Sequence, residues 1–360
     1  MRTTVAFCLR LRFAIVGVTL GIVLGLSPPA RAAGRQLVIG ALAPHLNDPS
    51  WVMITNYARH VAKVLDVQLE VLNGEGREDK QLADAQSLIS RHVDAIIFVP
   101  VSSADARKII ELADQAKIPI VVCDRYPGFP AKNSYAPYLT FIGPDNVAEG
   151  RAVADYLFAH GVKNLVAVGG TPGDPNNQAR TEGLHQAVAA WTNKGVKLVQ
   201  YVGAREESED GGYTVMNNLL AAHPSGTIDG LWCYNDALCL GAYKAIKQSG
   251  RSKQIKIGSM DLDAQALALI HDNTNYIYDF GGHWLQLGFA VMLAYDALHG
   301  HPPLTQLSQI EDFGIDAAGF AKYETEYLQH DPPIDIKKYM LTFNPSTKTQ
   351  IPPIGISSTN

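Results

Sequence analysis

Short runs of consecutive apolar residues alternate along the chain with longer segments of helical periodicity. Unbroken apolar runs are typical of parallel strands that are covered on both faces of a sheet. Within residues 78–91, Leu82, Ala85 and Leu88 recur at the spacing of one helical face. The first part is predicted to contain strands at Leu37–Ala43, Gln68–Asn73, Ala95–Val99 and Ile118–Cys123, and helices at Pro49–Leu65, Glu78–Arg91 and Ala104–Ala116.

The same alternation then starts a second time, after a loop at residues 126–138 that is rich in Pro and Gly. Two similar successive units predict an α/β fold with two Rossmann-like, doubly wound lobes and parallel sheets. The second part is predicted to contain strands at Leu139–Ile142, Leu165–Gly169, Leu198–Val202, Gly230–Tyr234, Ile255–Met260 and Tyr276–Phe280, and helices at Val147–Ala159, Asn177–Thr192, Gly211–Ala222, Ala237–Lys247 and Ala264–His271.

Polar residues follow several of these strands directly. Asn235 and Asp236 come after Gly230–Tyr234, and Asp124 with Arg125 follows Ile118–Cys123. Open α/β sheets bind ligands outside the carboxyl ends of their strands. We therefore expect Asn235 to meet a small molecule and Asp236 to cap the following helix. Because no catalytic motif accompanies these strand ends, the pattern indicates a binding protein and not an enzyme.

The first 32 residues have the composition of an export signal. Arginines such as Arg10 and Arg12 precede an apolar stretch at residues 13–26, and small residues follow at 30–32. The apolar stretch is short for a membrane span, which needs about 20 residues. We expect a cleaved signal peptide over residues 1–32 and a periplasmic mature chain, with an uncleaved N-terminal anchor as the alternative.

Charge restricts the class of partner. Removing the signal would take away four arginines and no acidic residue, so the formal charge would change from −5 to −9. Binding to nucleic acid requires Lys and Arg to neutralise phosphates. No nucleic-acid partner is therefore expected.

Three cysteines would remain in the mature chain, and an odd number excludes complete pairing. All three, Cys123, Cys233 and Cys239, lie in apolar contexts that are typical of buried thiols. A disulfide between Cys233 and Cys239 is the alternative in an oxidising compartment.

Several motifs in order resemble the type 1 periplasmic binding proteins of bacterial ABC transporters, in the ribose-binding branch. The resemblance extends from about Leu37 to about Gly300. Each motif alone is weak, and their combined order is specific. The motifs are Leu46-Asn47-Asp48-Pro49, Val93-Asp94-Ala95-Ile96-Ile97, Ile118-Pro119-Ile120-Val121, Asp124-Arg125, Gly143-Pro144-Asp145-Asn146, Ala179-Arg180-Thr181-Glu182-Gly183, Asn217-Asn218-Leu219-Leu220-Ala221-Ala222-His223-Pro224 and Tyr234-Asn235-Asp236.

The resemblance implies two lobes joined by three crossing segments. The N-terminal lobe would comprise residues 36–142 plus about 282–312, and the C-terminal lobe residues 143–281. The third crossing is expected near Ile310–Gly314. Residues from about 313 to 360 exceed the short tail of the family and form a C-terminal extension without an assigned role.

The resemblance also implies a ligand site between the lobes. Sugars favour aromatic rings against their C–H faces, and charged or amide groups that bond their hydroxyls. Trp51 would stack on the ligand. The candidate polar contacts are Asp48, Asp124, Arg125, Arg180, Asn235, Asp261, Asp279 and His283.

Structural roles are open for each of these candidates. Trp51 is also compatible with a helix core, and Asp48 with a helix cap. Asp124 and Arg125 could form an ion pair that holds the strand end, and Arg180 could be a surface charge. Asn235 and Asp261 could serve as turn or cap residues, and His283 could be a hinge histidine whose hydrogen bonds are satisfied within the protein.

Two departures from the family pattern point away from ribose itself. Ser50 replaces one aromatic of the family's pair, and the loop at residues 204–210 is acidic and has no aromatic. Neither a metal site nor a cofactor is expected. Asp261 and Asp263 diverge after their strand, and Gly169–Asp174 lacks the residues of a phosphate loop.

The resulting hypothesis is a monomeric periplasmic component of an ABC importer. It would capture a monosaccharide or related polyol by hinge closure and deliver it to a membrane permease. The alternative is a ligand-sensing protein that signals to a receptor kinase or chemoreceptor.

Overall fold

The apolar runs of the sequence form two sheets in which nearly all strands are parallel. The computed structural model describes residues 35–46, 49–132 and 137–354, and each sheet has six strands within those residues. In spatial order, sheet A contains β11 (Leu307–Gln309), β5 (Phe141–Gly143), β4 (Ile120–Cys123), β3 (Ala95–Phe98), β1 (Leu37–Ala43) and β2 (Val67–Asn73). Sheet B contains β12 (Phe313–Ile315), β10 (Tyr276–Gly281), β9 (Lys256–Met260), β8 (Gly230–Cys233), β6 (Asn164–Gly169) and β7 (Lys197–Gly203).

Both sheets have the same strand order over their first five strands. In sheet A, β1 lies between β2 and β3, and in sheet B, β6 lies between β7 and β8. The chain therefore reverses its direction of travel across each sheet once, which creates a crevice at the carboxyl ends of the strands. The predicted two-lobed α/β fold with Rossmann-like sheets is confirmed.

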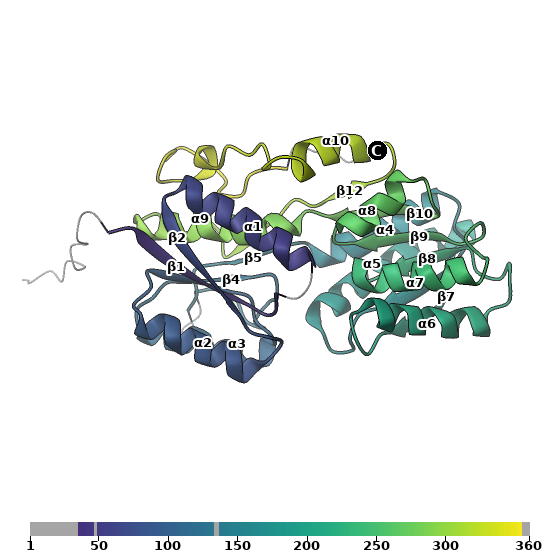
Figure 1. The fold of residues 1–360 in the computed structure, drawn as a ribbon, viewed down its shortest axis with the longest axis horizontal. Helices are drawn as coiled ribbons and strands as arrows, with labels where there is room; N and C mark the ends of the chain where they lie inside the picture. The colour runs from purple at the N-terminus through teal and green to yellow at the C-terminus, as the bar shows by residue number, and fades with distance from the viewer. Residues whose placement is uncertain (1–34, 47–48, 133–136, 355–360) are drawn as a thin grey trace, which may run out of the picture. The chain divides into compact units, whose positions relative to one another are not determined.

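Helices cover both faces of sheet A (Figure 1). Ile97 and Val99 point into the core beneath one pair of helices, and Ile96 and Phe98 into the core beneath the other pair. This double burial explains the unbroken apolar runs, because successive side chains of a strand face opposite sides. The first pair is α1 (Pro49–Val64) and α9 (Gln286–Leu298), and the second is α2 (Glu78–Ser90) and α3 (Ser103–Gln115).

Sheet B is flanked in the same way. Right-handed crossovers place the helix between β6 and β7 opposite the helices that follow β7, β8 and β9. Helix α4 packs against α5, and α6 against α7. The helices are α4 (Asn146–Ala159), α5 (Pro175–Trp191), α6 (Glu209–Ala222), α7 (Asp236–Gln248) and α8 (Ala264–His271).

Most predicted elements are found within three residues of their expected ends. The strands β11 and β12 and the short helix α10 (Phe320–Tyr323) are among the elements that the pattern did not predict. Strands of three residues are too short to produce a recognisable periodicity. They are nevertheless placed by pairing, because β11 extends sheet A beside β5 and β12 joins sheet B antiparallel to β10.

The chain passes between the two sheets three times. It leaves sheet A after β5, returns after β10, and passes from β11 in sheet A to β12 in sheet B through residues 310–312. The expected C-terminal extension from about residue 313 thus begins as a strand of sheet B. After α10, the chain runs back over α1 and α9 (Figure 1).

A single buried carboxylate anchors the end of this extension to α9. Asp296, which is 1% exposed, accepts hydrogen bonds from the backbone N–H groups of Leu341 at 2.8 Å and Thr342 at 3.0 Å. The Gln350 side chain donates a third bond to it at 2.7 Å. Several charge-assisted bonds to one carboxylate give the extension a defined position on the fold.

Helices α4 and α5 approach each other at two glycines. A Cβ at Gly183 would lie 2.0 Å from the carbonyl oxygen of Val147, and a Cβ at Gly150 would lie 1.9 Å from that of Arg180. Only glycine permits backbones to come this close. This contact holds the turn of α5 that carries Arg180 against α4.

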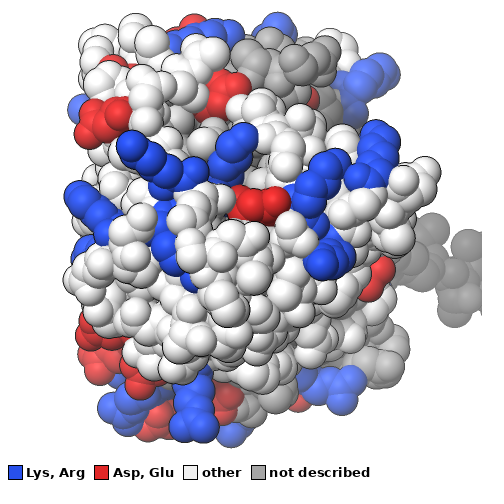
Figure 2. All heavy atoms as spheres, turned by 90° about the vertical axis from the view of Figure 1, so that its right-hand side faces the viewer, with Lys and Arg blue, Asp and Glu red and all other residues white. Residues whose placement is uncertain are grey.

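Lys and Arg side chains are interspersed with Asp and Glu on the face that Figure 2 shows. Mixed charge of this kind is typical of a solvated surface. Within the described ranges, no helix combines the length and the apolar character needed to cross a bilayer.

The close approach of α4 and α5 yields a stability prediction. Gly183→Ala should lower the free energy of unfolding by about 3 kcal/mol, because the new methyl group meets a backbone oxygen and not a movable side chain. Urea unfolding followed by circular dichroism measures the effect. Gly319→Ala is the matched control, since its nearest neighbour is 3.6 Å away. Equal stability of the two variants would contradict the packing argument.

Candidate ligand-binding site

Arg180 connects three elements of sheet B's lobe. This residue of α5 is only 4% exposed. Its Nε donates to the Glu149 Oε2 at 2.9 Å, and its Nη1 donates to the backbone oxygen of Tyr234 at 2.8 Å and to the Asp261 Oδ1 at 3.1 Å. Burial alone would lower the pKa of Arg180, but Glu149 and Asp261 raise it above its ordinary value. The guanidinium is a permanent cation within this network and not a surface charge.

Glu149 is the main residue of this network that the sequence did not reveal. It is 0% exposed, and α4 presents it to both Arg180 and His283. Burial opposes ionisation, yet Arg180 and His283 lower the pKa of Glu149 below its ordinary value. A helical Glu is usually solvated, so nothing in the local pattern distinguishes Glu149 from an exposed charge.

His283 lies between two carboxylates. Its Nδ1 is 3.3 Å from the Glu149 Oε1, and its Nε2 is 3.5 Å from the Asp261 Oδ1. Burial alone would lower its pKa, but the neighbouring carboxylate of Glu149 raises the pKa of His283 to about 9. The predicted residues Arg180, Asp261 and His283 therefore lie together.

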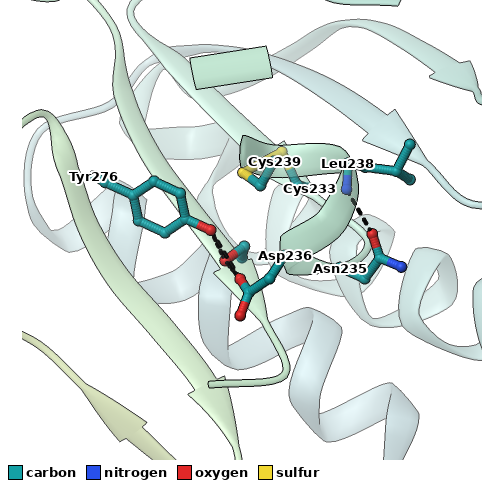
Figure 3. Close-up of a disulfide and its surroundings, with 7 residues drawn as sticks. Cys233, Asn235, Asp236, Leu238, Cys239 and Tyr276 are labelled. Atoms are coloured by element: carbon teal, nitrogen blue, oxygen red, sulfur yellow. Dashed lines mark hydrogen bonds between the residues drawn. A yellow bond between two sulfur atoms is a disulfide. The ribbon is translucent and has the colours of Figure 1, made fainter. Parts of the chain in front are cut away.

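Asn235 occupies the turn between β8 and α7. Its Oδ1 accepts a hydrogen bond from the backbone N–H of Leu238 at 3.0 Å, so Asn235 caps α7. The expectation that Asp236 caps this helix was wrong, because Asp236 is 0% exposed and turns into the core. Figure 3 shows the amide nitrogen of Asn235 directed away from the helix.

A disulfide brackets the same turn. Cys233 at the end of β8 is bonded to Cys239 in the first turns of α7, and both side chains are buried (Figure 3). Cys123 is a buried free thiol. The structure thus has the disulfide that the sequence left open, and it limits the conformations available to the turn that holds Asn235.

A second layer of carboxylates supports the first. Asp236 accepts hydrogen bonds from Ser259 and from the Tyr276 hydroxyl, the latter at 2.8 Å (Figure 3). Asp279 is 0% exposed and accepts from the backbone N–H of Leu262 at 3.3 Å. Burial raises the pKa of Asp279 to about 8, and burial together with the charge of Asp279 raises that of Asp236. Asp279 lies beneath the turn of Asp261 and not at a surface.

Asp124 and Arg125 lie at the carboxyl end of β4. Asp124 has a φ of +66° and accepts a hydrogen bond from the Gln286 side chain at 2.9 Å. The Arg125 Nη1 donates to the Val101 carbonyl oxygen at 3.0 Å, and its Nε is 3.9 Å from the Asp124 carboxylate. Gln286 follows His283 by three residues in the chain. Asp124 and Arg125 therefore adjoin the segment whose His283 contacts Asp261.

Trp51 packs in the first turns of α1. It is 6% exposed, and its ring centroid is 5.9 Å from that of His45 in an edge-on contact. Trp51 therefore belongs to the core in this conformation, and His45 is the ring that lines the adjoining cavity. Asp48, the other candidate on this segment, lies outside the described residues.

Segments that follow strands of both sheets line a cavity with a volume of about 820 Å³. A second cavity of about 490 Å³ includes Arg125 together with Thr171 and Asp174. The larger cavity is lined by His45, Asn73, Glu75, Gly76, Glu207, Ser208, Glu209, Ala237, Leu240, Asp263, Ala264 and Gln265.

Comparison with known proteins places the fold in a family. The model of the "periplasmic binding protein domain" family matches residues 39–302. The chain belongs to this family. Among its relatives, the ribose import binding protein of Salmonella typhimurium is 30% identical over 216 residues, which are 59% of this chain and 69% of the relative. A putative rhizopine-binding protein of Rhizobium meliloti is 28% identical over 267 residues, 71% of this chain and 80% of that protein.

Solved structures of this periplasmic binding protein family share the fold. A galactofuranose binding protein superposes with a TM-score of 0.73 at 21% identity and covers 81% of this chain and 99% of its own. The Caulobacter myo-inositol binding protein has a TM-score of 0.71 at 23% identity, and the match covers 83% of this chain and 98% of that protein. The resemblance to the ribose-binding branch, inferred from the motifs, is confirmed.

The raised pKa of Asp279 predicts a pH dependence of stability. Because the folded state holds this proton up to about pH 8 and the unfolded state releases it near pH 4, the contribution is complete at low pH and declines as the pH rises through that window. Asp279→Asn should make the decline of the unfolding free energy shallower by about 1 kcal/mol per pH unit.

Urea unfolding between pH 5 and pH 8 measures this difference. Asp272→Asn provides a control at an exposed acid that follows α8. Parallel pH profiles for the wild type and Asp279→Asn would show that Asp279 is ionised in the folded protein.

Proposed function

We propose that this protein is the solute-binding component of an ABC importer and that it captures a monosaccharide or related polyol in the periplasm. Relatives named as ribose import and galactofuranose-binding proteins support this function. Solved relatives include proteins with bound D-allose and bound myo-inositol. The names of the sequence relatives and of the solved structures refer to import or to ligand binding. These names favour delivery to a permease over a sensory or enzymatic role.

The 820 Å³ cavity carries the proposal. Its lining combines segments that follow β1 and β2 of sheet A with segments that follow β7, β8 and β9 of sheet B. Ligands of open α/β sheets bind at such carboxyl ends. A ligand held from both sides would favour the closed arrangement of the lobes through its differential contacts.

The proposed polar contacts come from both lobes and lie outside the lining of the 820 Å³ cavity, and Arg125 lines the 490 Å³ cavity. Asp124 and Arg125 would bond hydroxyls from sheet A, and Asn235 and Asp261 from sheet B. Asn235 can do so because its cap uses only the carbonyl oxygen and leaves the amide nitrogen available. Arg180 and His283 would orient Asp261, and Asp279 would support the turn from below. Trp51 packs behind His45 and would support that wall of the cavity.

The cavity differs from a simple pentose site in its acidic lining. Glu207 and Glu209, from the loop where the family often has an aromatic residue, lie in that lining beside Glu75 and Asp263. These carboxylates are acceptors for hydroxyl or amine donors. The ligand is therefore proposed to be a hydroxyl-rich molecule other than ribose.

The ligand site can be tested by thermal shift and calorimetry. D-Ribose, D-allose, galactofuranose, myo-inositol and amino-substituted inositols form the panel. At least one compound should raise the melting temperature of the wild type. Asn235→Ser and Asp124→Asn should each weaken its binding at least tenfold, a loss of about 1.4 kcal/mol.

Both substitutions preserve the local backbone. Serine is a good helix cap, and asparagine tolerates the positive φ of Asp124. Asn218→Ser, at an exposed position of α6, is the control and should bind as the wild type does. Unchanged affinity in both site variants would reject the proposed contacts, and no response to any compound would reject the ligand class.

A further inference from the structure

Side chains on or just after the three passages between the sheets converge on a common point. Glu149 follows the first passage, His283 lies on the second, and Asp312 lies on the third, between β11 and β12. A carboxylate oxygen of Glu149, a ring nitrogen of His283 and a carboxylate oxygen of Asp312 all lie within 4.8 Å of one another. Their positions in the sequence are far apart, so only the fold brings these groups together.

Each of the three side chains has one buried polar atom for which the described residues provide no hydrogen-bond partner. These atoms are the Glu149 Oε1, the His283 Nδ1 and the Asp312 Oδ1. The Nδ1 and the Oε1 approach to 3.3 Å, an ion-pair distance without the geometry of a hydrogen bond. A buried polar atom without a partner destabilises a fold. Three such atoms on side chains that converge indicate a place for a shared occupant.

The opposite atoms of two of these side chains are held in position. Arg180 bonds the Glu149 Oε2 at 2.8 Å, and the Asp261 Oδ1 lies 3.5 Å from the His283 Nε2. Metal-binding histidines characteristically present their second nitrogen to a carboxylate, and metal-binding carboxylates are themselves hydrogen-bonded. The surroundings thus orient Glu149 and His283 as a metal site requires.

The backbone leaves room at the same place. Gly282, which precedes His283, has a φ of +137°, and a Cβ there would lie 3.2 Å from the Asp312 Oδ1. Any other residue would crowd the carboxylate.

We propose that Glu149, His283 and Asp312 bind one divalent transition-metal ion. One nitrogen and two carboxylate oxygens suit Mn²⁺, Fe²⁺ or Zn²⁺, whereas Mg²⁺ and Ca²⁺ prefer oxygen ligands alone. Further coordination positions would be filled by water. Because each ligand comes from a different passage, the ion links the three segments on which movement between the lobes depends.

Metal binding is tested on the mature protein without a histidine tag, after treatment with EDTA. Zn²⁺ and Mn²⁺ are titrated separately by isothermal calorimetry, with Mg²⁺ and Ca²⁺ as comparison ions and no sugar present. One equivalent of Zn²⁺ or Mn²⁺ should bind per chain and raise the melting temperature. Asp312→Asn and His283→Gln should each weaken binding at least 30-fold.

The control variant is His271→Gln. His271 lies 3.2 Å from Asp272 in an exposed His–Asp pair, and its replacement should leave metal affinity unchanged. Glu149 is not substituted, since its loss would strand the buried guanidinium of Arg180. Circular dichroism and a cooperative melt without metal establish that each variant is folded.

A readout on the wild type does not depend on the folding of variants. Co²⁺ should give visible d–d absorption bands on binding, and Zn²⁺ should displace them. The proposal is overturned by the absence of these bands, by absence of stoichiometric binding, or by binding that persists in folded Asp312→Asn and His283→Gln. It is overturned equally if only His271→Gln abolishes binding.

The metal site and the sugar site can fail separately. Asn235→Ser should bind Zn²⁺ or Mn²⁺ as the wild type does, because Asn235 lies outside the three ligands. Sugar binding by EDTA-treated protein is measured independently. A protein that binds sugar without any metal uptake would reject the metal site and leave the proposed function intact.

Discussion

The buried guanidinium of Arg180 is the interaction on which the arrangement of the site depends. One side chain bonds Glu149 on α4, the backbone of Tyr234 at the end of β8, and Asp261 after β9. A charge that is taken out of water must be paired, and loss of one partner leaves the other uncompensated. Arg180 therefore holds together three segments that are remote in sequence. The glycines at the contact between α4 and α5 let the two helices come close enough for Arg180 to reach Glu149.

Around this cation the carboxylates are ordered in two layers. Asp261 and Glu149, which Arg180 and His283 contact, form the first layer. Asp236 and Asp279 form a deeper layer, bonded to hydroxyls and backbone N–H groups. Desolvation raises the pKa values of the deeper pair, whereas the cations of the upper layer keep Glu149 ionised. The pKa of a buried carboxylate in this region thus depends on whether a cation lies beside it.

The passages between the sheets concentrate the polar groups of the fold. Backbone leaves regular structure there, so side chains from distant parts of the chain can meet without competing with strand packing. Gln286 bonds Asp124 in this region, and His283, which precedes Gln286 by three residues, converges with Glu149 and Asp312. The C-terminal extension adds a further tie, because it starts in sheet B and ends on Asp296 of α9.

The sequence by itself determined the two α/β units, nearly all of their strands and helices, and the strand ends at Asp124, Arg125, Asn235 and Asp261. Unbroken apolar runs and helical periodicity are local properties, and a polar residue after a buried strand can be read without knowledge of its neighbours. The tertiary structure decided which of these residues meet. Glu149, Asp312 and Gln286 carry no local signal, since a polar residue on a helix or loop is usually solvated, and only packing buries them. The tertiary structure also decided that Asn235 and not Asp236 caps α7, that Asp279 lies beneath the site, and that Cys233 pairs with Cys239. Each of these outcomes depends on the distance between segments that the chain brings together only when both sheets have formed.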